Sequence, residues 1–187
     1  MILPRIPNSY PLPSVYTDEE IRAILGSIDR STVQGSRDFA ILLLASSLGI
    51  RASDICEMTL EAINFVKNEL CFIQKKTSVP LTLPLLPDVK EALLGYLGCR
   101  KINSTDEPIF IQCRAPYHKL TRMGIWTIMR RYLKQSGVDP GHRKRGTHAL
   151  RSSLPVLWSG SRFRTMPYKR FSDTKAPSPQ KITCGLI

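Results

Sequence analysis

The sequence predicts a mainly α-helical (α+β) fold, in which helices pack around a small three-stranded antiparallel sheet. Apolar residues recur at helical spacing before residue 60 and after residue 85, and they form short strand-like runs between 62 and 84. The chain has 187 residues, 42% of them hydrophobic, which is enough for one full-sized domain with a tail. We therefore predict an extended Pro-rich leader (1–16), a domain (17–154) and a basic irregular tail (155–187).

The first two predicted helices have clear end signals. Thr17 and Glu20 have the spacing of a capping box, and apolar residues follow at helical spacing up to Ile28. The second helix runs from about Gly35 to Leu48 and is apolar nearly all round, which is typical of a helix buried in the centre of a domain. Gly49 can end it in a left-handed turn.

The period then changes from helical to extended. Three short apolar runs, 62–65, 69–73 and 79–83, are separated by turn-forming and charged residues. They predict two consecutive hairpins, with Lys76 at the tip of the second hairpin.

Helical spacing returns after the predicted sheet. One helix begins at Pro87 and ends at Gly98, and another carries an apolar stripe over 125–133. Thr147 can cap a short last helix. Beyond residue 155 neither period is present, so we expect a disordered C-terminal tail.

Charge is concentrated at the C-terminal end. The chain has 27 Lys and Arg against 15 Asp and Glu, and residues 141–187 contain 10 of the basic and 1 of the acidic side chains. This favours a polyanion partner, nucleic acid before membrane, although a solvated basic tail would give the same charge pattern. The longest purely apolar stretch, 39–45, is too short to cross a membrane, and residues 1–10 do not resemble a secretory signal. We therefore expect a cytoplasmic protein.

The five cysteines indicate neither a metal site nor a disulfide framework. They lie far apart, with no C-x-x-C pair and no histidine at ligand spacing. We interpret them as buried reduced thiols.

Four cationic or imidazole side chains stand where the predicted elements would hold them rigidly. Arg51 follows the buried helix, Lys76 lies at a hairpin tip, and His148 and Arg151 share one helical face. Two guanidinium groups can hold the oxygens of a phosphate, and lysine or histidine can donate a proton to a leaving oxygen. Such a set suits phosphoryl chemistry and requires no metal ion.

In this order and on these elements, the residues resemble the catalytic domain of the tyrosine recombinases, the phage-integrase family. The resemblance covers about 17–153 and rests on three blocks. They are Leu48-Gly49-Ile50-Arg51-Ala52-Ser53-Asp54-Ile55, Phe72-Ile73-Gln74-Lys75-Lys76-Thr77 and Thr147-His148-Ala149-Leu150-Arg151. The resemblance implies that Arg51, Lys76, His148 and Arg151 are catalytic and that Asp54 supports Arg51.

The family's chemistry is strand cleavage and rejoining in DNA through a covalent phosphotyrosine, without a cofactor or metal ion. The resemblance therefore implies duplex DNA and other recombinase subunits as partners. Two departures stand out: residues 1–16 are too few for the family's DNA-clamping domain, and its Gly-His and tyrosine segment is missing after Arg151. Tyr168, 17 positions beyond Arg151, is a poor candidate nucleophile. We expect a truncated or frameshifted recombinase that binds DNA and cannot cut it alone.

Basic residues outside the blocks are candidates for contacts with DNA phosphates. They are Arg122, Arg130, Arg131, Lys134, Arg143, Lys144 and Arg145. Two alternatives stay open: a non-catalytic, regulatory recombinase remnant, and an unrelated RNA-binding protein with Tyr132 and Phe163 as stacking residues.

Overall fold

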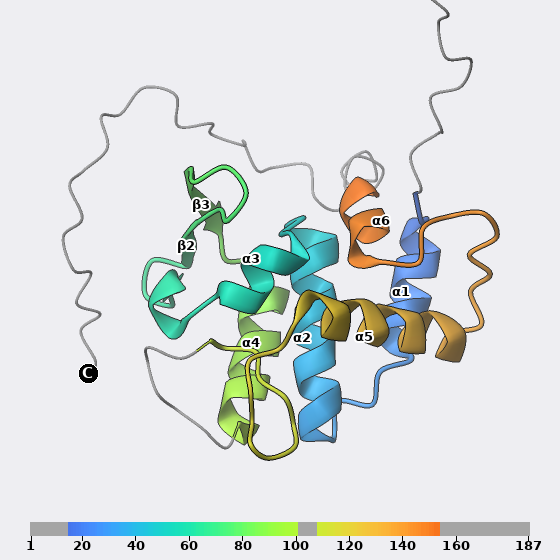
Figure 1. Ribbon diagram of the computed structural model, residues 1–187, viewed down its shortest axis with the longest axis horizontal. Coiled ribbons are helices and arrows are strands. Elements are labelled where there is room, and N and C mark those ends of the chain that lie inside the picture. Colours follow the sequence, from blue (N-terminus) through green and yellow to red (C-terminus); the bar gives the residue numbers. More distant parts are fainter. Residues whose placement is uncertain (1–14, 101–107, 154–187) are drawn as a thin grey trace, which may run out of the picture.

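The computed structural model describes residues 15–100 and 108–153, which form a helical domain with a small sheet at one end (Figure 1). The elements in chain order are α1 (Asp18–Gly26), α2 (Val33–Ser47), α3 (Ala52–Glu57), the 3-10 turn η1 (Leu60–Ala62), β1 (Ile63–Asn64), β2 (Glu69–Ile73), β3 (Pro80–Pro84), α4 (Pro87–Cys99), α5 (Arg122–Gln135) and α6 (Thr147–Ser152). The predicted mainly helical fold with a three-stranded antiparallel sheet is confirmed. Most of the predicted leader, and the predicted tail from residue 155 onward, lie outside the described residues.

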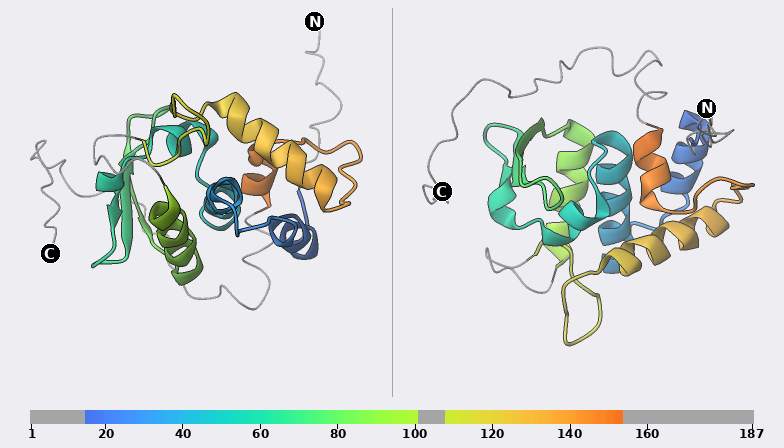
Figure 2. Two further views of the ribbon diagram at one scale, coloured as in Figure 1. Left: turned by 90° about the horizontal axis from the view of Figure 1, so that it is seen from below. Right: turned by 45° about the horizontal axis from the view of Figure 1, so that its top comes forward.

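Helix α2 is the centre of the domain. It contacts α1, α3, α4, α5 and α6, and its residues Ile41, Leu42 and Leu44 are fully buried (Figures 1 and 2). The prediction of a central helix that is apolar nearly all round is confirmed. Burial of this kind is the main favourable term in folding, so α2 is the element against which the others are positioned.

Local signals at the helix ends work as predicted. The Thr17 hydroxyl accepts from the Glu20 amide while the Glu20 carboxylate accepts from the Thr17 amide, which completes the capping box. Gly49 has a φ of 62°, the left-handed conformation that glycine adopts without strain. This turn leads the chain from the end of α2 directly into Arg51, the N-cap residue of α3.

The sheet has the order β1-β2-β3, and both pairings are antiparallel. Leu70 lies opposite Leu83 and Phe72 opposite Leu81, so the larger apolar side chains share one face of the β2–β3 hairpin. The turn that joins β2 to β3 contains Lys76, as predicted, and this residue is exposed.

Three details differ from the sequence predictions. Thr147 is the first residue of α6 rather than its cap; the N-cap is Gly146, which makes no side-chain cap bond. Helix α3 was not predicted, because six residues are too few to show a period. Tyr16, which we placed in the leader, is buried, and its backbone N–H donates to Ser153.

The cysteine prediction is partly right. The four described cysteines are free, as expected, but Cys56 alone among them is buried, and burial raises its thiol pKa to about 11. Cys71, Cys99 and Cys113 are half-buried. The fifth, Cys184, lies outside the described residues.

Candidate phosphate-binding site

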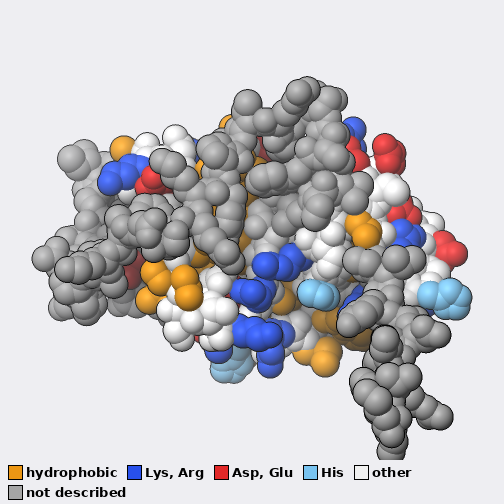
Figure 3. Space-filling view, turned by 90° about the horizontal axis from the view of Figure 1, so that it is seen from above, with side chains coloured by type: hydrophobic (Ala, Val, Ile, Leu, Met, Phe, Trp, Pro, Cys, Tyr) orange, Lys and Arg blue, Asp and Glu red, His pale blue; other side chains and the backbone are white. Residues whose placement is uncertain are grey.

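The three blocks singled out in the sequence meet at one side of the domain. The start of α3, the β2–β3 hairpin and α6 all lie along the upper side of the molecule in Figure 1. Seen from that side, Lys and Arg side chains gather in the middle of the face, beside a histidine (Figure 3). A phosphate ligand on this face would meet local positive charge.

Arg51 is held with unused hydrogen-bonding capacity. Its side chain is 31% exposed, and its NH1 atom lies 4.0 Å from Oδ2 of Asp54. That nitrogen is buried and donates no hydrogen bond among the described residues. A guanidinium nitrogen in this condition can gain a strong, charge-assisted bond from an anion.

Asp54, the predicted supporting residue, connects α3 to the hairpin. Its carboxylate is almost completely buried and accepts from the Lys75 amide at 3.0 Å and from the Ser53 hydroxyl at 3.3 Å. Lys75 precedes Lys76 at the hairpin tip. The same carboxylate therefore faces Arg51 and fixes the backbone next to Lys76.

Arg151, near the C-terminal end of the described chain, reaches the Gly49 turn that precedes Arg51. Its NH1 donates to the carbonyl oxygen of Gly49, a residue 102 positions earlier in the chain. Helix α6, which carries Arg151, packs on α2, and its end is anchored by Ser153, whose hydroxyl accepts from the backbone of Tyr16 at 2.7 Å. His148 lies one turn before Arg151 on α6 and is exposed.

The structure thus pairs Arg51 with Asp54 and bonds Arg151 to the Gly49 carbonyl, two residues before Arg51. It places Lys76 next to Lys75, whose amide is bound by Asp54. His148 is on the same short helix as Arg151. Their joint catalytic role stays a prediction.

The seven candidate DNA-contact residues divide into two groups. Exposed positions are Arg122, Arg130, Arg131, Lys134, Lys144 and Arg145, whereas Arg143 is half-buried. Arg130 stacks on the ring of Trp126 with 4.6 Å between guanidinium carbon and ring centroid, and Arg131 lies 3.4 Å from the buried carboxylate of Asp38.

Arg143 has a well-defined role inside the fold. Its guanidinium bonds both oxygens of Glu20, at 2.6 and 2.7 Å, and lies over the ring of Tyr16. The bond from Arg143 lowers the pKa of the Glu20 carboxyl. Arg143 therefore fastens the segment before α6 to α1, and its predicted contact with DNA stays a prediction.

Two polar clusters escaped the sequence analysis. The first is buried between α2 and α5 and contains Arg37, Asp38 and Tyr132. Tyr132 is 6% exposed and donates to Asp38, so the structure contradicts its proposed role as a stacking residue; Phe163 lies outside the described residues. The sequence did contain a signal for this cluster, because Arg37 and Asp38 are adjacent charged residues near the start of an otherwise apolar helix.

The second cluster joins Glu57 to Lys75 and Lys119. No sequence signal pointed to it, because the three residues lie on separate segments of the chain.

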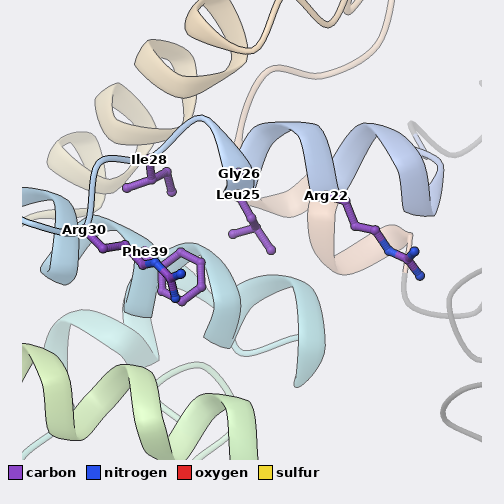
Figure 4. Close-up of a pocket in the computed structure, with 6 residues that line it drawn as sticks. All are labelled: Arg22, Leu25, Gly26, Ile28, Arg30 and Phe39. Atoms are coloured by element: carbon purple, nitrogen blue, oxygen red, sulfur yellow. The ribbon is translucent and has the colours of Figure 1, made fainter.

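A hollow of about 250 Å³ at the junction of α1 and α2 is separate from this face (Figure 4). Its lining residues are Arg22, Leu25, Gly26, Ile28, Arg30 and Phe39. None of the predicted site residues is among them.

Within 15–100 and 108–153, no group of three or more His, Cys, Asp or Glu side chains is placed to hold a metal ion. Over the same residues, no helix is both long and apolar enough to cross a membrane.

A family model described as "Phage integrase family" matches residues 14–156. The chain therefore belongs to the phage integrase family, and its described part has the fold of a tyrosine recombinase catalytic domain.

Similar sequences include a putative integrase/recombinase of Sinorhizobium fredii, y4gC, which is 36% identical over 141 residues that cover 75% of this chain and 72% of the relative. Tyrosine recombinase XerA of Pyrococcus furiosus is 30% identical over 163 residues, covering 82% of this chain and 53% of the relative. The chain thus spans about half the length of XerA.

Solved structures show the same fold. A XerA recombinase superposes with a TM-score of 0.64 at 17% identity, covering 87% of this chain and 55% of the other. Lambda integrase (residues 75–356) bound to DNA gives a TM-score of 0.62 at 25% identity, covering 83% and 54%.

Proposed function

We propose that this chain is the catalytic domain of a site-specific DNA recombinase, which binds duplex DNA and holds a backbone phosphate between Arg51 and Arg151. The observation that best supports this proposal is the hydrogen bond from Arg151 to the Gly49 carbonyl. It joins the block that contains Arg151 to the block that contains Arg51 at one turn. Membership of the phage integrase family and the likeness to DNA-bound lambda integrase support the same function.

Each proposed residue has a distinct task at the phosphate. Arg51 and Arg151 donate to the two non-bridging oxygens and stabilise the charge of a five-coordinate phosphorus. A tyrosine oxygen forms the new bond to phosphorus while the bond to the 5′ oxygen breaks. Lys76 gives that oxygen its proton, and His148 assists proton transfer. The phosphotyrosine preserves the phosphodiester energy for rejoining.

Three of the four tyrosines in the described region are buried: Tyr16, Tyr96 and Tyr132. Burial raises the pKa of each of these phenols, which disfavours the phenolate. The fourth, Tyr117, is half-buried and lies outside the three blocks, and none of the four supplies the nucleophile in this proposal. Tyr168 lies outside the described residues. We infer that the chain binds DNA but forms no phosphotyrosine unaided, since without a phenol in line the proximity contribution of about 7–11 kcal/mol is lost.

The lack of a tyrosine placed to attack the phosphate favours a second candidate function. In it, the chain is a regulatory protein that occupies recombination sites or joins active subunits. Mixing the chain with a full-length relative separates the two functions. If a partner subunit supplies the tyrosine, strand cleavage in the mixture depends on Arg51 and Arg151 of this chain; a regulatory protein changes cleavage independently of them.

DNA binding is tested by fluorescence anisotropy with a labelled duplex over a range of salt concentrations. We expect weak binding with little sequence preference, with log affinity falling by about 0.9 per neutralised phosphate for each unit of log salt. Binding that does not change with salt, or that clearly prefers RNA of the same length, contradicts the proposal.

Whether the chain carries its own nucleophile is tested with a pool of nicked duplexes that have a randomised centre. With such a pool the target site need not be known. After incubation and denaturation we expect no protein–DNA adduct from a preparation that binds the pool. An adduct that disappears in Tyr168→Phe would show that the chain carries its own nucleophile.

A further inference from the structure

A carboxylate at the end of α3 holds two lysines from different segments. Oε1 of Glu57 lies 2.5 Å from Nζ of Lys75 in the β2–β3 turn, and Oε2 lies 2.5 Å from Nζ of Lys119 in the segment before α5. All three side chains are partly exposed, by 39%, 61% and 43%. Glu57 is therefore a bridge on the molecular surface and not part of the core.

We propose that Glu57 is a positioning residue for Lys76, which it holds near the phosphate site by fastening the neighbouring Lys75 to α3 and to the segment of Lys119. This inference rests on the proposed function, because it assumes that Lys76 contacts the phosphate.

The hairpin tip depends on such a fastening. The side chain of Lys76 makes no hydrogen bond or ion pair among the described residues, so its place is set by the backbone of the turn. That turn is held at two points outside the sheet: the Lys75 amide on Asp54, and the Lys75 ammonium on Glu57. Asp54 holds the backbone of the tip, and Glu57 holds the side chain next to Lys76.

Charge explains why a single carboxylate can hold both lysines. The bonds from Lys119 and Lys75 lower the pKa of Glu57, which stays ionised at neutral pH. Without it, two ammonium groups that now share one carboxylate would repel each other and move the tip away from the segment before α5. Exposed ion pairs contribute little to global stability, so we expect the effect to be confined to the tip.

The decisive experiment is a double-mutant cycle with inorganic phosphate as the probe. The affinity is measured from the amide NMR shifts of residues 51–54 at constant pH and salt. We expect Lys76→Met to weaken phosphate binding about fivefold and Glu57→Gln about threefold, while the double variant binds no more weakly than Lys76→Met alone. Glu61→Gln, which removes a negative charge four residues away, is the matched control and leaves the affinity unchanged.

The outcomes separate the two proposals. If Lys76→Met leaves phosphate binding unchanged, the proposed function fails at Lys76, and the positioning role fails with it. If Lys76→Met weakens binding but Glu57→Gln does not, or if the two effects multiply in the double variant, the positioning role alone is overturned.

Hydrogen exchange provides a readout that does not depend on the ligand. In Glu57→Gln we expect the Lys75 amide to exchange about threefold faster with an unchanged thermal midpoint, and Glu57→Asp to restore part of the protection. An unchanged exchange rate at Lys75, or a fall in the thermal midpoint with faster exchange throughout α3, would overturn the positioning role.

Discussion

Two arginine–aspartate pairs of this domain differ in how completely their hydrogen bonds are made. One pair, Arg37 and Asp38, lies between α2 and α5; the other, Arg51 and Asp54, lies at the start of α3. Both aspartates are almost completely buried, but the Arg37 side chain is 7% exposed whereas the Arg51 side chain is 31% exposed.

In the first pair every charged atom has a partner. Nε and NH2 of Arg37 donate to Asp38 at 2.9 and 2.6 Å, and NH1 donates to the Ile111 carbonyl at 3.0 Å. The other oxygen of Asp38 accepts from Tyr132 at 3.2 Å. Burial raises the pKa of Asp38, and the neighbouring Arg37 opposes that rise.

In the second pair the arginine is under-bonded. Its NH1 makes no hydrogen bond among the described residues and lies 4.0 Å from Asp54. A buried cation that stabilises a fold must be saturated by protein acceptors, because an unpaired buried charge is costly. A cation that binds a ligand needs N–H donors that make no hydrogen bond within the protein. The comparison thus assigns a structural role to Arg37 and supports a ligand role for Arg51.

We expect the largest effect on stability when the fully hydrogen-bonded pair, Arg37 and Asp38, is broken. Asp38→Ala leaves the Arg37 guanidinium buried without its carboxylate, so we expect a loss of about 3–5 kcal/mol in the free energy of unfolding. Asp54→Ala leaves a partly solvated arginine and should cost less than half as much. Urea denaturation of both variants measures the difference, and equal losses would contradict the division into structural and ligand-binding pairs.

The next prediction concerns ligand binding by the under-bonded pair. Arg51→Ala should lower affinity for duplex DNA at least about tenfold, because a hydrogen bond to a charged group contributes about 1.5–3 kcal/mol. The salt slope should fall by about 0.9, while the free energy of unfolding changes by less than about 1 kcal/mol. Arg22→Ala, which removes an exposed arginine paired with Asp18, is the control for net charge. Equal affinities of the two variants would remove the ligand role of Arg51.

We expect the smallest effect on stability from a third arginine, Arg143. Its hydrogen bonds to Glu20 join two side chains that are both partly exposed. Because the folded pKa of Glu20 lies below its ordinary value of 4.5, the pair stabilises the fold above that pH. This contribution, about 1 kcal/mol or less, is lost as the pH falls through the lowered pKa.

Glu20→Gln should therefore be less stable than the wild type at pH 7, and the difference should be smaller at pH 3. Denaturation curves at both pH values give the difference, in which the other carboxylates cancel. A stability difference between the two proteins that is the same at both pH values would show that Glu20 acts through packing alone.

The sequence by itself determined most of the secondary structure and the nature of the site, because both depend on local patterns. Capping at Thr17, the left-handed turn at Gly49 and the hairpin tip at Lys76 follow from residue types within a few positions of one another. The three blocks likewise contain their own chemistry: two arginines, a lysine and a histidine suited to a phosphate.

The tertiary structure alone decided which charged residues face a ligand and which hold the fold together. Arg143 and Arg51 are both half-buried arginines, yet Glu20, 123 positions away, accepts from the first through both carboxylate oxygens, while NH1 of the second has no hydrogen-bond partner among the described residues. Glu57 became significant for the same reason, since its lysine partners are 18 and 62 positions distant. Hydrogen bonds between such distant residues form only when the buried face of α2 draws the other helices around it, and no local pattern in the sequence records that packing.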